Sequence, residues 1–230
     1  MLGGFLMHKN AMSNRMKQLN EGTIEDTVNV TTLENSKRDH KIGITTQAIS
    51  KVPLIEYPGV PKEQWCIIQE LLKEVLRLSK DKNNSDEVCI VYNYLELTNL
   101  ENIRDTYGVV FGDEHSVQPD GSTVSYHILN SSIDCVVIIL HNHPSLSKIS
   151  LQDIYYMLSF RSVKLMVAVT NLGSITFVVK GDDYNREAAI KLYKEAVAME
   201  IKGTTLKDKQ NAVQFFINKC RDVGLYYGYR

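Results

Sequence analysis

The feature that most constrains the fold is an uninterrupted apolar run at residues 135–140, CVVIIL. A short apolar run dominated by β-branched residues is typical of a strand that lies in a core. Apolar residues make up 43% of the 230-residue chain, which is enough to build a core around that strand. The run therefore predicts a buried strand in a domain with a substantial interior.

The segments on either side of this run alternate between helical and extended patterns. Residues 61–79 predict a helix, because Pro61 suits a first helical position and apolar residues then recur at helical spacing. Further strands are predicted at residues 87–95, 109–111, 122–128, 164–170 and 174–180, and further helices at residues 150–160, 184–202 and 206–223. This alternation predicts an α/β domain, a mixed sheet flanked by helices, with helical additions at both ends.

Three segments are expected along the chain. Residues 1–51 form a flexible or loosely packed segment, because residues 20–41 contain almost no large apolar side chains. Residues 52–202 form the α/β domain, and residues 203–230 a C-terminal helical extension. The final YYGYR is expected to be a tail that packs or frays.

Charge and cysteine usage narrow the function classes. The net charge is −1, from 26 basic and 27 acidic side chains, without the basic excess of a typical nucleic-acid-binding protein. The four cysteines contain no C-x-x-C pair, which excludes a zinc ribbon and disfavours a disulfide framework. No run approaches the 18 apolar residues of a membrane span. These patterns predict a cytoplasmic protein without a membrane segment, for which nucleic acid is not the expected partner.

The residues that carry chemistry directly follow the apolar run, in the string HNHPSLSKISLQD at residues 141–153. His141 and His143 are two residues apart in extended chain, so their side chains point to the same side. Pro144 then turns the chain, and a helix beginning near Ser150 brings Asp153 back over the strand end. Two imidazoles and one carboxylate leave one position of a tetrahedral zinc ion open, as in catalytic sites.

Each of these residues also has a purely structural interpretation. Ser150 and Asp153 form S-x-x-D, which by itself is more often a helix-capping arrangement. A single histidine at a strand end is usually a structural residue, and a chance H-x-H-P is not rare. The combination of all of them, after a buried strand and before a capped helix, favours a metal site.

H-x-H-P followed by S-x-x-D resembles the signature of the JAB/MPN (JAMM) zinc metalloproteases, and HNHPS is most similar to RadC-like and mobile-element JAB domains. The loop between His143 and Ser150 is one residue shorter than in the commonest pattern. The resemblance implies a JAB/MPN-like (cytidine-deaminase-like) fold and a Zn²⁺ ion on His141, His143 and Asp153. It also implies that Ser150 hydrogen-bonds the zinc-bound water or the oxyanion.

The resemblance further implies a general base, a glutamate at the start of an earlier strand, and Glu87 matches that position. Glu96 is the best rival, near the other end of the same strand, and Glu101 and Glu114 are weaker ones. His115 and His127 lie in the insert at residues 96–130 and are expected to be solvated or structural.

Three functions are compatible with these patterns. The leading hypothesis is a zinc-dependent metallopeptidase or isopeptidase that acts on a protein or peptide substrate. The first alternative is a non-catalytic MPN-type interaction module, which the complete motif disfavours. The second is a mobile-element or DNA-associated accessory protein, which the missing basic cluster disfavours. An HNH nuclease is excluded, because its three residues are dispersed through a ββα unit rather than contiguous.

Overall fold

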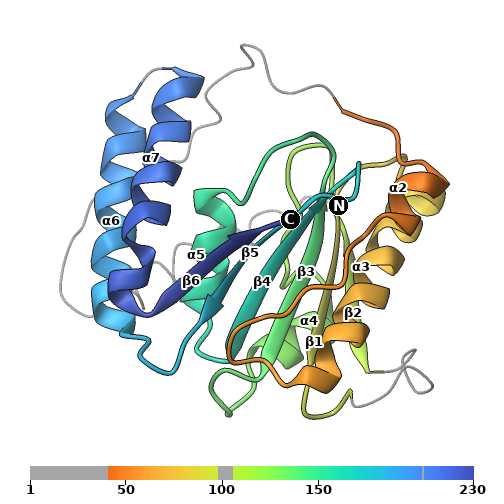
Figure 1. Ribbon diagram of the computed structural model, residues 1–230, viewed down its shortest axis with the longest axis horizontal. Helices are drawn as coiled ribbons and strands as arrows, with labels where there is room; N and C mark the ends of the chain where they lie inside the picture. Colours follow the sequence, from red (N-terminus) through yellow and green to blue (C-terminus); the bar gives the residue numbers. More distant parts are fainter. Residues whose placement is uncertain (1–40, 98–105, 204) are drawn as a thin grey trace. The chain divides into compact units, whose positions relative to one another are not determined.

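The computed structural model describes residues 41–97, 106–203 and 205–230 (Figure 1). The elements are α2 (Thr46–Ser50), α3 (Lys62–Lys82), β1 (Val88–Asn93), β2 (Tyr107–Phe111), α4 (Thr123–Leu129), β3 (Val137–His143), α5 (Leu151–Ser159), β4 (Val163–Thr170), β5 (Ile175–Lys180), α6 (Arg186–Lys202), α7 (Leu206–Lys219), η2 (Cys220–Val223) and β6 (Leu225–Tyr229). In the described part of the chain, no helix combines the length and the apolar character that crossing a bilayer requires.

A six-stranded mixed sheet organises these elements, in the order β2-β1-β3-β4-β5-β6. Only β3 and β4 run parallel, and α5 makes the crossover between them, whereas the other neighbours pair antiparallel. Every residue of β1, β3, β4 and β5 is buried, which explains their near-continuous apolar sequences. The prediction of a mixed sheet flanked by helices is confirmed.

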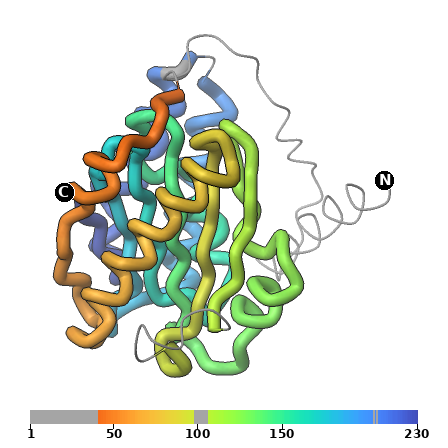
Figure 2. Tube along the Cα trace, turned by 90° about the vertical axis from the view of Figure 1, so that its right-hand side faces the viewer, coloured from red at the N-terminus to blue at the C-terminus, as the bar shows by residue number. Residues whose placement is uncertain are grey.

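Helices cover both faces of the sheet. On one face, α3 packs against β1 and β3, and Figure 2 shows this helix in front of the sheet. The apolar stripe of α3 forms a core cluster with alternate residues of the strands. On the other face, α4 contacts β1 and β2, and α5 contacts β4. Helix α6 packs against α5, and α7 against α6 (Figure 1). Residues that alternate along a strand therefore face two different helical layers.

Two predicted elements differ from the structure. Residues 122–128, predicted as a strand, form the helix α4, whose N-cap Ser122 accepts a hydrogen bond from the Ser125 backbone. The buried residues of this helix are Ser125 and Leu129, which have helical spacing, and Gly108 of β2 lets it approach because a Cβ there would clash with Ser125. Packing against β2 thus overrides a composition that favours a strand.

The C-terminal segment is the second difference, because it is not only helical. After α7 and η2, the residues expected to form a tail make the edge strand β6, in which Leu225 pairs with Lys180 and Tyr229 with Thr176. Leu225 is fully buried, and Gly224 reverses the chain ahead of it with a φ of 73°. Residues 203–230 are therefore part of the same packed unit as the sheet.

The N-terminal boundary also lies earlier than expected. One compact unit spans Asp39–Arg230, so the boundary expected after residue 51 falls inside it. Ile44 and Ile49 are buried in the α3-side core, and the Ile42 backbone N–H donates to the Pro144 carbonyl at 2.8 Å. Residues 1–40 of the expected flexible segment lie outside the described residues.

Removing residues 41–51 should therefore destabilise the domain. A chain that begins at Val52 is expected to lose about 3–6 kcal/mol of unfolding free energy relative to one that begins at Lys41. Burial of an isoleucine side chain contributes about 1.5–3 kcal/mol, and Ile44 and Ile49 are both lost. Urea unfolding of the two chains measures this difference, and coincident midpoints would contradict the packing described here.

Lys180, at the end of β5, makes the stability depend on pH. Burial lowers the pKa of this lysine to about 8, and its ammonium donates to the Phe160 carbonyl at 3.0 Å. Between about pH 8 and 10.5 the unfolded chain binds the proton that the folded chain has released, so Lys180 makes the folded state more stable as the pH rises. Between pH 7.5 and 10.5, the unfolding free energy of wild type should increase by about 3 kcal/mol relative to that of Lys180→Met. Unfolding curves of both chains across this range would contradict the prediction if they shifted in parallel.

Candidate metal centre

The end of β3 presents two imidazoles on one face of the sheet. His141 and His143 are 2% and 5% exposed and alternate with Asn142, which points to the other face. The residues opposite His141 are Cys89 on β1 and Ala168 on β4. Because these neighbours are small, the face has room for the imidazole ring. Both predicted histidines thus lie side by side, with ring centroids 4.8 Å apart.

Asp153 reaches the histidines from the first turn of α5. Ser150 is the N-cap of this helix, and its backbone N–H and its hydroxyl each donate to Asp153 Oδ2 at 2.7 Å. The Asp153 N–H in turn donates to Ser150 Oγ at 3.2 Å, which completes a capping box. The structural interpretation of S-x-x-D is therefore correct, and the same box holds the Asp153 carboxylate in a fixed orientation.

The three donor groups meet at spacings that fit a metal ion. His141 Nε2 is 2.9 Å from His143 Nε2 and 3.1 Å from Asp153 Oδ1, and His143 Nε2 is 3.5 Å from Asp153 Oδ2. In a tetrahedral zinc site with bonds of 2.0–2.1 Å, neighbouring ligand atoms lie about 3.3 Å apart. Two imidazole nitrogens and one carboxylate oxygen are donors that zinc accepts. The residues present therefore fit a three-ligand zinc site.

Further contacts of His143 fix the orientation of its ring and raise its pKa. His143 Nδ1 donates to the Ser147 carbonyl at 2.9 Å, because a carbonyl can only accept, and this leaves Nε2 toward Asp153. Burial disfavours the imidazolium, but the hydrogen bond and charge of Asp153 outweigh burial and raise the pKa of His143 to about 9. Burial likewise acts against the Asp153 anion, yet His141 and His143 hold its pKa well below the usual value. The carboxylate and the imidazoles thus stabilise one another's charges, and a metal ion at this position would take the place of the proton on His143.

Glu87 lies on the same face as the ligands. Cys89 pairs with His141, so two residues earlier along the antiparallel strand Glu87 comes level with His143. The Glu87 side chain is only 8% exposed, and the charges of His143, Asp153 and Asp113 all act on it. Burial, as the largest cause, raises the pKa of Glu87 to about 8, although the positive charge of His143 opposes it.

The rival glutamates and the remaining histidines lie elsewhere. Glu96 is exposed beyond the far end of β1, where it accepts a hydrogen bond from Asn93 at 3.0 Å. Glu114, His115 and His127 are exposed as well, as expected for the two histidines. Glu101 lies outside the described residues. The one group of His, Cys, Asp or Glu side chains within ligand reach of one another in the described ranges is the predicted triad.

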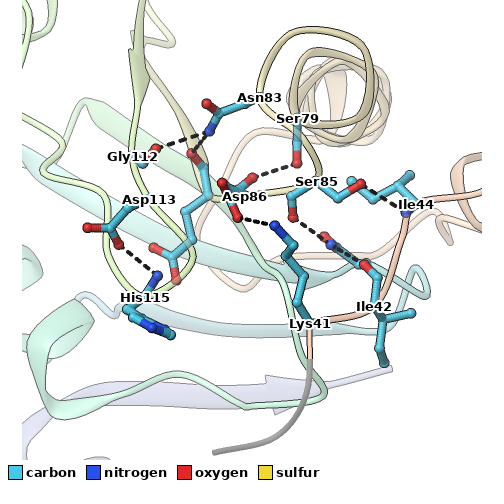
Figure 3. A network of polar contacts seen from close by, with 12 residues as sticks. Lys41, Ile42, Ile44, Ser79, Asn83, Ser85, Asp86, Gly112, Asp113 and His115 are labelled. Carbon is cyan, nitrogen blue, oxygen red and sulfur yellow. Dashed lines mark hydrogen bonds and ion pairs between the residues drawn. The ribbon is translucent and has the colours of Figure 1, made fainter. Parts of the chain in front are cut away.

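A buried polar network behind the ligands was not predicted. It joins Asn142 to the end of α3 and to the loop before β1, and Figure 3 shows the part around that loop. There, Ser79 Oγ donates to the Asp86 carbonyl at 2.6 Å, and Lys41 pairs with the Asp86 carboxylate at 2.8 Å (Figure 3). An asparagine at the end of a buried strand was the available signal, because such a residue must find hydrogen-bond partners when buried.

Comparisons with family models, with curated proteins and with solved structures found no match to this chain.

Proposed function

We propose that this chain is a zinc-dependent hydrolase that cleaves an amide or isopeptide bond in a protein or peptide, at a site of the JAMM type. The observation that supports this most strongly is the meeting of His141, His143 and Asp153, whose ligand atoms lie within 4.8 Å of one another, with Glu87 buried on the same face. A structural site is closed by four protein ligands, whereas a hydrolytic site has three and an open position. The described donor set contains three.

In this proposal His141, His143 and Asp153 hold the zinc ion through two Nε2 atoms and a carboxylate oxygen. When bound, zinc polarises the substrate carbonyl and makes water a stronger acid, with a pKa near about 7. Glu87 accepts the proton of the attacking water on its carboxylate and donates it to the leaving amine. Burial raises the pKa of Glu87 above that of a free carboxyl, which makes its carboxylate a stronger base toward the attacking water.

Ser150 is proposed to stabilise the developing oxyanion of the substrate carbonyl, in keeping with the resemblance. In the structure its single hydroxyl hydrogen is donated to Asp153 Oδ2, where it orients a ligand, so stabilising the oxyanion requires the hydroxyl to turn toward the substrate. Replacing Ser150 by alanine removes both contributions. Ser150→Asn lacks the hydroxyl but still caps helices, so it separates these contributions from simple loss of the N-cap.

The proposed fold type is JAB/MPN-like, and its support is the order of the elements around the site. The family that the motif resembles has a helix, a glutamate-bearing strand, a variable insert, the motif-bearing strand, a helix and a hairpin, and here α3, β1, the insert with β2 and α4, β3, α5 and the β4–β5 hairpin follow in that order. A cytoplasmic location, and a protein or peptide rather than a nucleic acid as partner, complete the proposal. The near-zero net charge supports the choice of partner.

The test combines metal analysis with a cleavage assay. The zinc-loaded chain is incubated with two mixed-sequence quenched-fluorescent libraries, one of linear peptides and one of peptides branched through a lysine isopeptide bond. Cleavage that stops after removal of zinc by a chelator and returns when zinc is restored supports the proposal. A zinc-loaded chain that cleaves neither library would favour the non-catalytic interaction module instead.

A further inference from the structure

We propose that Asn142 is a positioning residue, which holds the backbone of Glu87 in register with the two histidine ligands. This inference rests on the proposed function, because Asn142 matters to the reaction only if Glu87 is the general base. Asn142 is fully buried, and the hydrogen bonds of its side chain go to Val88, Asp86, Ser79 and Asn171 rather than to the ligand atoms of the triad. Its role is therefore carried by the groups that its side-chain amide binds.

The amide of Asn142 binds the chain on both sides of Glu87. The Val88 N–H donates to Asn142 Oδ1 at 2.7 Å, and Asn142 Nδ2 donates to the Asp86 carbonyl at 3.1 Å. The paired register of β1 and β3 ends at Cys89 and His141, and the Asn142 side chain binds the Val88 N–H one residue beyond that pair. A single side chain thus fixes the peptide groups that precede and follow the base.

Asn142 is also fixed relative to the ligands by its place in the chain. Its immediate neighbours are His141 and His143, whose side chains point to the opposite face of β3. Continuing the antiparallel register beyond the Cys89–His141 pair brings Val88 level with Asn142 and Glu87 level with His143. In the proposal His141 and His143 hold the metal ion and Glu87 is the base, and Asn142 connects the two segments through Val88 and Asp86.

The orientation of the Asn142 amide follows from its partners. Because Oδ1 accepts from Val88, Nδ2 faces the acceptors Asp86 O, Ser79 Oγ at 3.1 Å and Asn171 Oδ1 at 2.8 Å. Asn171 is itself fully buried, and its Nδ2 donates to the carbonyls of Ile42 and Ser85. An aspartate at position 142 would lose the donors, and a serine would be too short to bind both Asp86 and Val88.

Hydrogen bonds to other residues also fix the backbone of Glu87 itself. Its N–H donates to the Asp113 carbonyl at 3.0 Å, and its carbonyl accepts from Gly112 N and from Asn83 Nδ2, both at 2.8 Å. Figure 3 shows Asn83, Gly112 and Asp113 around this loop. The pairing of β1 with β3 reaches Cys89, and the Asn142 contacts extend the connection to the ligand strand to both sides of Glu87 itself.

The experiment measures how Asn142 acts on the base without requiring a known substrate. Acetohydroxamic acid is the probe, because it binds zinc as the hydroxamate and gives its proton to a nearby carboxylate, here Glu87. Its Kd for the zinc-loaded chain is determined by calorimetry for wild type, Asn142→Ala, Glu87→Gln and the double variant. Asn142→Ala is expected to keep one zinc per chain and to bind the probe about 10- to 100-fold more weakly, as is typical when a second-layer contact at a metal site is lost.

The double variant distinguishes positioning from general damage. If Asn142 acts through Glu87, Asn142→Ala changes the Kd little further when Glu87 is already glutamine. Equal losses in both backgrounds, or an unchanged Kd in Asn142→Ala, would overturn the inference. Zinc analysis keeps the two proposals apart, since a wild-type chain that binds no zinc contradicts the proposed function itself.

Asn171→Ala is the matched control, because it removes a buried hydrogen-bond partner of Asn142 but leaves the contacts to Val88 and Asp86. It should lower stability while the probe affinity stays near that of wild type. If Asn142→Ala does not fold, Asn142→Ser is used instead, because the larger side chain leaves a smaller cavity and lowers the unfolding free energy less. Amide exchange at Val88 in the metal-free chain then gives a second readout, since loss of the Asn142 acceptor should speed exchange there, and unchanged protection would contradict the clamp.

Discussion

Replacing Glu87 by glutamine should leave the fold and the zinc content unchanged and reduce hydrolysis by about a thousandfold or more, within the range expected for loss of a general base. Glutamine has nearly the shape of glutamate, but its amide cannot take a proton from water at neutral pH. The measurement is kcat/KM on a peptide that the wild-type chain cleaves, together with the zinc content of both proteins.

Glu96→Gln and Glu114→Gln are the matched controls for this substitution. Both remove one carboxylate, but their side chains are exposed, and Glu96 lies beyond the far end of β1. Their activity should equal that of wild type. If Glu87→Gln kept most of its activity while one of these variants lost it, the general base would be assigned to the wrong glutamate.

Substitution of either His141 or Asp153 by alanine should abolish stoichiometric zinc binding. Their donor atoms are 3.1 Å apart, and removal of one leaves two ligands, which hold zinc poorly. In Asp153→Ala the capping box of α5 is lost as well, so this variant should also be less stable. Elemental analysis after dialysis against metal-free buffer gives the zinc content directly.

His115→Ala and His127→Ala serve as controls, because both histidines are exposed and neither belongs to the triad. They should retain the wild-type zinc content. A double variant that lacks both His141 and His143 yet keeps one zinc per chain would show that the metal binds elsewhere, and the proposed site would then be wrong.

The parts of the fold that sequence predicted correctly are those with a strong local signal. The buried strand after Cys135, the capped helix α5 and the hairpin of β4 and β5 each have a period or a turn that only one structure satisfies. The triad followed from the same local information, because all three residues lie within 13 positions of one another. Their convergence needed only one strand end and one helical turn.

The features that were missed depend on partners far along the chain. Residues 122–128 look extended until they pack on β2, and the edge strand β6 exists because β5 offers it a free neighbour. The local sequence assigns no role to Asn142, which stands between two histidines. Its hydrogen-bond partners Ser79 and Asn171 are 63 and 29 residues away along the chain. Tertiary contacts of this kind carry no signal in a window of local sequence.

The different separations of ligands and base along the chain have a consequence for the order of folding. His141 and Asp153 are joined by a loop of a dozen residues, whereas Glu87 joins the site from 54 positions before His141. Chain entropy makes the shorter closure cheaper, and contacts between distant segments form more slowly. As the chain folds, we therefore expect the capacity to capture a metal ion to arise before β1 has docked. If the chain is the proposed hydrolase, metal-loaded but still inactive chains would precede the active state, and rapid-mixing experiments would resolve two events, zinc uptake first and the onset of hydrolysis second.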